Sequence, residues 1–324
     1  MIKRGVNIIP DVPMEQVVSL GVKAEELGFD KCWVYDEGLV TRDVYISLAA
    51  IAGKTARIQL GTGITSPYTR HPAVTASAIA TLDEYSGGRA FLGIGAGGSL
   101  TLSPMAIERY KPLTAVRESL QAIRGLFRNE TVTLEGEVVR LNQARMEYGR
   151  ADIPIWLAGR GSKMLSLGGE LADGVVLEFL HKQRIQANID TVKAGAERSG
   201  NRPKMCYSTM IITNDRVLEE LRPHMTYRLV DSPLEIKDML GIAQDEIDKI
   251  HHVMVTQGLY AAGKLIKDEW ISPFVIMGSP SACAQEIADI MTRYQFDEFL
   301  LPILETKTAV ELMQEVSQVL GIAG

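Results

Sequence analysis

The sequence predicts an α/β fold, a (β/α)8 TIM barrel formed by a single domain over residues 1–324. Residues 60–98 first suggest this, because they contain a strand, a helix and a second strand in succession. Two parallel strands joined by one helix form a βαβ unit. Six further apolar runs also alternate with helical segments, which gives eight units, the number that closes such a barrel. An open doubly wound sheet is the alternative architecture.

The central unit explains why these residues should form these elements. Residues 57–62 are a short apolar run, and residues 90–94 are a second one. Between them, Pro72 suits the first turn of a helix, and apolar residues then recur at helical spacing as far as Leu82. Two glycines at 87 and 88 end this helix, so the segment predicts strand, helix and strand.

The other barrel elements are predicted from the same signals. The remaining strands are short apolar runs at 5–9, 31–35, 154–158, 173–177, 205–213 and 299–301. The remaining helices are 11–27, closed by Gly28; 43–54; 112–127, begun by a proline; one ending at Leu171; one ending near Arg198; 280–294; and 305–320.

Two segments interrupt the alternation of strands and helices. Residues 129–150 contain alternating apolar and polar residues around Gly136, which predicts a β-hairpin insertion before strand 5. Residues 214–278 are too long for one crossover and predict a helical insertion after strand 7, with helices near Leu218, near Ile236 and over 245–265. Neither insertion is expected to be an independent domain.

Composition limits the possible partners and compartment. The net charge of −6 argues against binding to nucleic acid or to an anionic membrane. Cys32, Cys206 and Cys283 are far apart and lack the spacing of metal ligands, so buried thiols in a reducing compartment are expected. The sequence has no signal-peptide pattern and no apolar run of membrane-spanning length. We therefore expect a cytoplasmic protein that contacts no membrane.

A long part of the central unit carries a family resemblance, in residues 61–65, 67–70, 72–81, 82–84, 86–89 and 92–95. These segments resemble the luciferase-like oxidoreductase superfamily. Within it, the nearest branch resembles the methylenetetrahydromethanopterin reductases, which use the deazaflavin coenzyme F-420. Weaker similarity covers most of the chain.

The candidate site residues come directly after the predicted strands, because active sites of such barrels lie at the carboxyl ends of the strands. Candidate catalytic residues are Asp36, Glu37 and Asn7. Candidate cofactor-binding residues are Gly63, Ile64, Thr65, Gly95, Ala96, Gly97, Gly159, Gly161, Ser162, Lys163 and Glu178. No histidine pair has the spacing of metal ligands on a shared face, so no metal site is expected.

The chemistry of two of these groups can be argued from residue type. Residues 159–163 offer open amides, a hydroxyl and a helix N-terminus, which suit an anion, and Arg160 and Lys163 add positive charge. A simple helix cap with surface charges is the alternative. Asp36 and Glu37 could orient a substrate or donate a proton if burial raises their pKa. A helix cap or an ion pair with Arg42 is the alternative there.

The resemblance adds specific expectations about the site. It implies a cis peptide bond between Gly63 and Ile64, whose bulge supports the cofactor ring, with the 95–97 loop near that ring. It also implies cofactor phosphate contacts around 159–163. Asp36 matches an acid of the deazaflavin branch, whereas Glu37 stands where related enzymes often have histidine. Asn7 and Gly98 stand where the pterin reductases carry acidic residues, which puts the pterin substrate in doubt.

The function expected from this resemblance is hydride transfer between F-420 and a small organic substrate. One alternative keeps the fold and uses FMN and dioxygen, as a luciferase-like monooxygenase. Another is a flavin-binding protein without turnover. The resemblance also implies a homodimer or higher homo-oligomer formed through helices beside the early strands.

Overall fold

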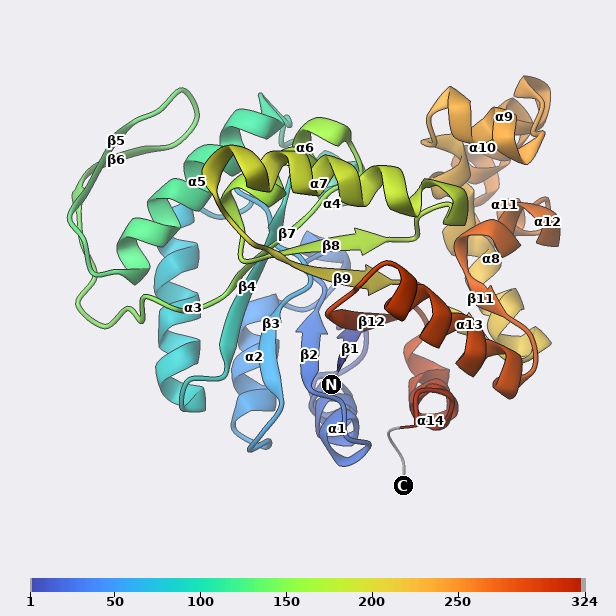
Figure 1. The fold of residues 1–324 in the computed structure, drawn as a ribbon, viewed down its shortest axis with the longest axis horizontal. Helices are drawn as coiled ribbons and strands as arrows, with labels where there is room; N and C mark the ends of the chain where they lie inside the picture. Colours follow the sequence, from blue (N-terminus) through green and yellow to red (C-terminus); the bar gives the residue numbers. More distant parts are fainter. Residues whose placement is uncertain (1, 322–324) are drawn as a thin grey trace.

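The computed structural model describes residues 2–321, apart from the side chains of residues 99 and 100. Eight parallel strands close into a barrel in the order β1-β12-β9-β8-β7-β4-β3-β2 (Figure 1). These strands are β1 (Lys3–Ile8), β2 (Lys31–Val34), β3 (Gln59–Thr62), β4 (Ala90–Gly95), β7 (Ile155–Ala158), β8 (Gly174–Glu178), β9 (Lys204–Ser208) and β12 (Glu298–Ile303). The predicted barrel is therefore confirmed, and the open sheet is excluded.

Eight long helices follow the barrel strands and cover the outside of the barrel (Figure 1). They are α1 (Met14–Glu26), α2 (Val44–Ala52), α3 (Pro72–Ser86), α5 (Pro112–Phe127), α6 (Ser162–Leu171), α7 (Ile185–Ser199), α13 (Pro280–Arg293) and α14 (Ala309–Val319). Local chemistry fixes their ends. The Asp43 carboxylate accepts the amides of Tyr45 and Ile46 at 2.9 and 3.0 Å, and Gly87 ends α3 with a φ of 71°.

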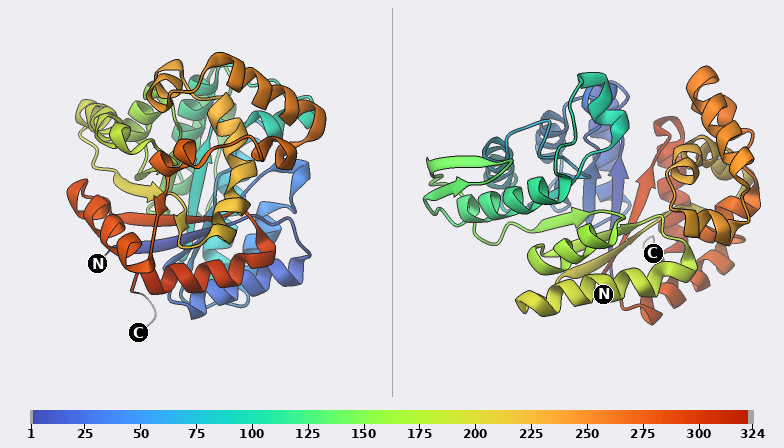
Figure 2. Two further views of the ribbon diagram at one scale, coloured as in Figure 1. Left: turned by 90° about the vertical axis from the view of Figure 1, so that its right-hand side faces the viewer. Right: turned by 90° about the horizontal axis from the view of Figure 1, so that it is seen from above.

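The two predicted insertions lie at opposite ends of the molecule (Figures 1 and 2). The first is the antiparallel hairpin of β5 (Val132–Glu135) and β6 (Arg140–Ala144). The second contains α8 (Asp215–Val230), α9 (Leu234–Leu240), α10 (Gln244–Gln257), α11 (Leu259–Gly263) and α12 (Asp268–Ile271). These helices lie beyond the carboxyl ends of β8 and β9 (Figure 1).

Three predicted elements were wrong in detail. The predicted strand at 205–213 is two strands, because Met210 breaks away and β10 (Ile211–Ile212) pairs outside the barrel with β11 (Ile276–Met277). The predicted helix over 245–265 is interrupted at Gly258, whose φ of 88° separates α10 from α11. The sequence also predicts a loop from β4 to about Lys111, and this segment contains the short helix α4 (Ser99–Leu102).

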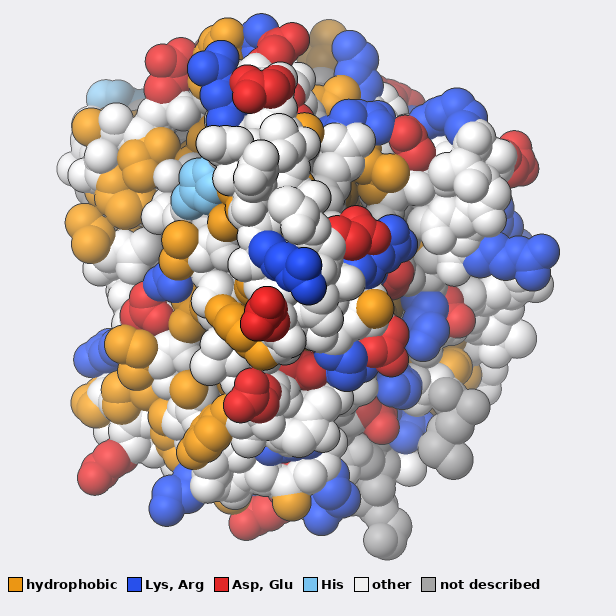
Figure 3. All heavy atoms as spheres, turned by 90° about the vertical axis from the view of Figure 1, so that its left-hand side faces the viewer, with side chains coloured by type: hydrophobic (Ala, Val, Ile, Leu, Met, Phe, Trp, Pro, Cys, Tyr) orange, Lys and Arg blue, Asp and Glu red, His pale blue; other side chains and the backbone are white. Residues whose placement is uncertain are grey.

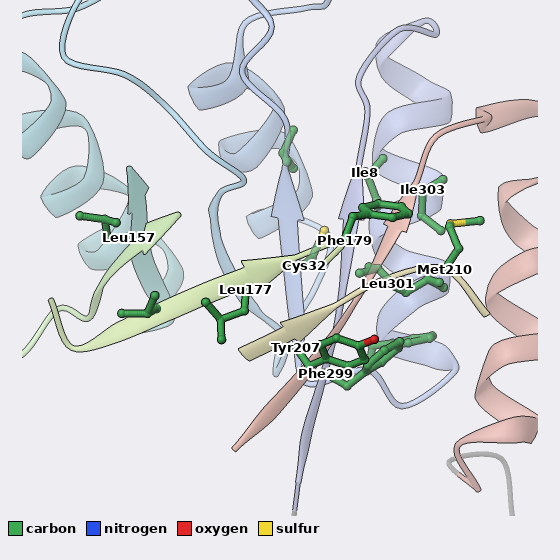
Figure 4. Close-up of a cluster of buried hydrophobic side chains, with 14 of the residues drawn as sticks. Ile8, Cys32, Leu157, Leu177, Phe179, Tyr207, Met210, Phe299, Leu301 and Ile303 are labelled. Carbon is green, nitrogen blue, oxygen red and sulfur yellow. The ribbon is translucent and has the colours of Figure 1, made fainter. Parts of the chain in front are cut away.

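The core has an outer layer between barrel and helices and an inner aromatic cluster. Ile8, Leu177 and Leu301 belong to the outer layer (Figure 4). Inside the barrel, Trp33 packs edge-on against Phe91 and Trp156, with ring centroids 4.4 and 5.7 Å away. The aromatic rings occupy the space beside strand glycines such as Gly174, where a Cβ would overlap Trp156. The barrel is thus a packed core rather than a pore.

Glycines also set the close approach of α6 to α7, which gives a stability prediction. A Cβ on Gly195 would fall on the Ser166 carbonyl oxygen, inside van der Waals contact. Because backbone atoms cannot move aside cheaply, we expect Gly195→Ala to destabilise the protein by roughly 1–3 kcal/mol, measured by urea unfolding. Gly98→Ala is the control, since its Cβ would meet only Thr101 Oγ1 at 3.9 Å. Equal stability of both variants would contradict this packing account.

Candidate active site

The site lies where the carboxyl ends of β1, β2, β3 and β4 meet. The side chain of Asn7, 4% exposed, donates from Nδ2 to the Gly63 carbonyl at 2.7 Å. The Gly63–Ile64 peptide bond is cis, as the resemblance implied. Gly63 itself is required by crowding, because a Cβ there would overlap the Asn7 amide. Asn7 therefore fixes the Gly63 carbonyl and the backbone that leads into Ile64.

Asp36 is tied to this backbone segment through Thr65. The Thr65 hydroxyl donates to Asp36 Oδ2 at 2.6 Å and accepts from the Tyr45 hydroxyl at 3.5 Å. Burial raises the pKa of Asp36, and the Thr65 hydrogen bond opposes that rise. The alternative ion pair between Asp36 and Arg42 does not form among the described residues. Asp43, the residue after Arg42, caps α2, and its Oδ2 lies 3.4 Å from Arg70 Nη2.

Glu37 is the second half-buried carboxyl group of the site. Its Oε2 accepts a short hydrogen bond from the Thr101 hydroxyl on α4. Burial raises the pKa of Glu37, and the nearby carboxylates of Asp36 and Glu178 raise it further, while Thr101 lowers it. Glu37 is thus biased toward the protonated form, which a proton donor requires.

Glu178, at the end of β8, connects the barrel to the helical insertion. The buried side chain of Arg228 on α8 approaches Glu178 Oε2 with Nη2 at 3.3 Å. The Arg228 guanidinium also stacks on the Phe179 ring at 3.9 Å from its centroid. The α8 helix is therefore fixed to the floor of the site by one charged and one aromatic contact.

The glycines in the loop after β4 allow neighbouring residues to pack closely against the backbone. A Cβ on Gly95 would overlap Ile64 and lie 2.7 Å from the Ala158 carbonyl oxygen. Gly97 has a φ of 72°, and its carbonyl accepts from Arg109 Nη1 at 3.0 Å. Gly95 thus makes room for the Ile64 side chain, a role that its sequence pattern alone does not reveal. Ala96, between them, is half-buried.

The loop of residues 159–163 leads into the N-terminus of α6. Gly161, Ser162 and Lys163 are exposed, and a Cβ on Gly161 would meet nothing within 4 Å. Gly159 packs against the Met164 side chain instead. The charge of Arg228 lowers the pKa of Arg160. The N-terminal amides of α6 and these cations make an open place for an anion.

Sequence reasoning missed Tyr45, Thr101 and Arg228. Each lies outside the residues that directly follow a barrel strand, and two of them come from short or inserted helices. Asp43, two residues before Tyr45, signals the start of a helix. Only the folded structure brings Tyr45 on that helix to Thr65. No group of three or more His, Cys, Asp or Glu side chains in residues 2–321 is arranged to hold a metal ion.

The chain matches the luciferase-like monooxygenase family over residues 2–297. It belongs to this family. A relative from Methanolobus tindarius, a 5,10-methylenetetrahydromethanopterin reductase, is 34% identical over 295 residues, which are 89% of this chain and 90% of the relative. An F-420-dependent glucose-6-phosphate dehydrogenase from Kineococcus radiotolerans is 34% identical over 174 residues, about half of each chain (50% and 51%).

Solved structures of the luciferase-like family share the architecture. The F-420-dependent tetrahydromethanopterin reductase from Methanopyrus kandleri superimposes with a TM-score of 0.87 at 25% identity, over 98% of this chain and 97% of that one. An F-420-dependent secondary alcohol dehydrogenase superimposes with a TM-score of 0.78 at 17% identity, over 100% and 99% of the chains. The second likeness concerns the fold alone. The chain is thus a luciferase-like TIM-barrel oxidoreductase.

None of the helices in the described residues is long and apolar enough to span a membrane.

Proposed function

We propose that this protein is an F-420-dependent oxidoreductase that transfers a hydride between the deazaflavin and a small organic substrate. The observation that carries the proposal is the 34% identity to a methylenetetrahydromethanopterin reductase over about nine-tenths of both chains. The site is consistent with it, because Ile64 lies against Gly95, and Thr65 and Thr101 hold the carboxyl groups of Asp36 and Glu37. The cofactor would supply the hydride chemistry, and the chain would supply binding, orientation and a proton.

The residues fit such a cofactor at two places. Ile64, held by the Asn7–Gly63 hydrogen bond, would support one face of the ring. Thr65 and the 95–97 loop would border the ring, and Glu178, fixed by Arg228, would lie beside it. The exposed α6 N-terminus with Ser162 and Lys163 would hold the phosphate.

The substrate is proposed only as a small organic molecule that stacks opposite Ile64, below the helical insertion. Asn7 cannot act as an acid, and Gly98 has no side chain, so two carboxylates expected for the pterin reaction are missing. Asp36 and Glu37 remain as the acids that could orient the substrate or protonate it. Reducible carbonyl, imine or alkene compounds are therefore the first candidates.

The test is a titration of cofactor-free protein with F-420 and with FMN, followed by fluorescence quenching. We expect micromolar or tighter binding of F-420 and weaker binding of FMN. Preference for FMN would favour the luciferase-like monooxygenase with dioxygen. Tight F-420 binding without reduction of any candidate substrate would favour a non-catalytic flavin-binding protein. Binding of neither cofactor would overturn the proposal.

The phosphate subsite gives a second prediction. Replacing both Arg160 and Lys163 by glutamine removes two cations beside the α6 N-terminus. Since a hydrogen bond to a charged group contributes roughly 1.5–3 kcal/mol, we expect F-420 binding to weaken by about tenfold or more. The phosphate-free deazaflavin core should bind both proteins equally well. Equal F-420 affinity of variant and unaltered protein would place the phosphate elsewhere.

A homodimer is proposed through the α2–α3 side of the barrel. Leu39, Val40, Ile46 and Val74 are 51–77% exposed there, on η1 (Gly38–Val40), α2 and α3. On the face that carries α3 and the hairpin, hydrophobic side chains gather toward the left of the view, with charged side chains among and around them (Figure 3). We expect a dimer by light scattering, and a monomer for Ile46→Lys. A monomeric unaltered protein would refute this proposal.

The cytoplasm is the proposed location, supported by three free cysteines, all buried in the described structure. Cell fractionation would test it.

A further inference from the structure

A cavity lies at the end of the barrel opposite to the proposed cofactor site. Its volume is about 820 Å³, and the first residues of five barrel strands line it: Lys3, Lys31, Gln59, Lys204 and Glu298. Since all strands of the barrel are parallel, these residues mark its amino-terminal end. The cavity therefore shares no residue with the site described above.

Every carboxylate that lines this cavity already has a cation as its partner. The buried Glu298 lies 2.7 Å from Lys31, and Asp173 lies 2.6 Å from Arg124. The two others pair with arginines outside the lining, Glu170 with Arg117 and Asp152 with Arg150, both at 2.7 Å. The negative charge of the wall is thus compensated within the protein.

Several lining cations, in contrast, have no close partner. Among the described residues, Lys3 and Lys204 have no carboxylate oxygen within 4.0 Å, and Arg128 has only Glu130 at 4.0 Å. The Lys3 ammonium makes one long hydrogen bond of 3.4 Å to Gln59. Lysine and arginine can only donate hydrogen bonds. The polar groups of the cavity that remain without close partners are therefore positively charged hydrogen-bond donors. They occur in a chain whose net charge is −6.

We propose that this cavity binds a small polyvalent oxyanion that carries phosphate or carboxylate groups. Its oxygens would accept hydrogen bonds from Lys3, Lys204 and Arg128, above a floor formed by the Lys31–Glu298 pair. The volume lies within the roughly 300–1,000 Å³ range of small-molecule sites. Uncompensated cations around a concave surface also concentrate anions there. The site is independent of the proposed F-420 function.

The test uses the full chain in phosphate-free buffer at constant ionic strength, with pyrophosphate and citrate as probes. Tryptophan fluorescence and the melting temperature report binding, because Trp156 lines the cavity. We expect saturable binding of pyrophosphate and a rise in melting temperature. Binding of citrate as well would indicate a general oxyanion site, and binding of pyrophosphate alone would indicate a phosphate site. Saturable binding of neither probe would overturn the proposal.

Variants separate this cavity from the α6 N-terminus. The double variant Lys3→Gln/Lys204→Gln should bind pyrophosphate about tenfold or more weakly, with unchanged F-420 affinity. Lys249→Gln, an exposed position on α10, should bind it as the unaltered protein does. Loss of pyrophosphate binding in Arg160→Gln/Lys163→Gln, with retention in Lys3→Gln/Lys204→Gln, would assign the anion to the other end and refute the proposal.

Discussion

Lys31→Met is expected to lower the free energy of unfolding by about 3–5 kcal/mol. The Lys31 ammonium lies 2.7 Å from Glu298 at the amino-terminal end of the barrel, and both side chains are about 95% buried, with exposed fractions of 5% and 4%. The ammonium also lies 4.1 Å above the Trp156 ring. Removing it leaves the Glu298 carboxylate buried without its partner, and a buried unpaired charge is costly. Urea unfolding would measure the loss.

A double variant tests whether the loss comes from the orphaned carboxylate. Burial lowers the pKa of Lys31 more than Glu298 raises it, so the attraction of Glu298 does not fully offset the desolvation of this ammonium group. Lys31→Met/Glu298→Leu should therefore recover most of the lost stability. The exposed Lys23–Glu26 pair at 3.1 Å is the control, and Lys23→Met should cost less than about 1 kcal/mol. A double variant as unstable as the single one would show that Lys31 acts through packing.

Much of the barrel was predictable because its signals are local. The cap at Asp43, the proline at the start of α3 and the glycine after it each act within a few residues of the element they bound. The strands are short and apolar on both faces, as buried parallel strands must be. Eight such units in succession leave few ways to bury all these faces, so the pattern indicates a barrel.

The errors arose where distant segments decide the structure. Residues 205–213 are one apolar run, but β10 leaves the barrel because Ile211 and Ile212 pair with residues 276 and 277. The Thr209 hydroxyl donates to the Phe274 carbonyl at 2.6 Å and anchors this departure. No local pattern contains that partner. The break at Gly258, in contrast, has a visible signal, a glycine within a helical pattern.

The site shows the same contrast between features set by local sequence and features set by distant segments. Positions after strands could be predicted, since barrel topology brings those ends together. Their partners could not, because Thr101 is 64 residues from Glu37 and Arg228 is 50 residues from Glu178 in sequence. Consequently the sequence could name the carboxyl groups but not the burial that raises their pKa. Variants that keep the fold test the proposed roles of these residues.

Glu37→Gln is expected to reduce hydride transfer by roughly 10²–10⁴-fold, the usual contribution of a general acid. Glutamine keeps the shape and can still accept from Thr101, but it cannot donate a proton in the reaction. F-420 affinity should stay nearly unchanged, since Glu37 is proposed as the acid rather than as a phosphate contact. Oxidation of reduced F-420 by a selected carbonyl, imine or alkene compound would measure the rate, and quenching would measure affinity.

The pH dependence of the rate would test Glu37 as the acid more specifically than the loss of rate does. A proton donor must be protonated, so activity should fall as pH rises through the Glu37 pKa, which burial holds above its ordinary value. The Thr101 hydrogen bond lowers this pKa, so Thr101→Val should raise it and move the falling limb to higher pH. Glu37→Gln should lose that limb altogether. If the limb stays in Glu37→Gln, or does not move in Thr101→Val, another group donates the proton, and Asp36 would be next because its pKa is also raised by burial.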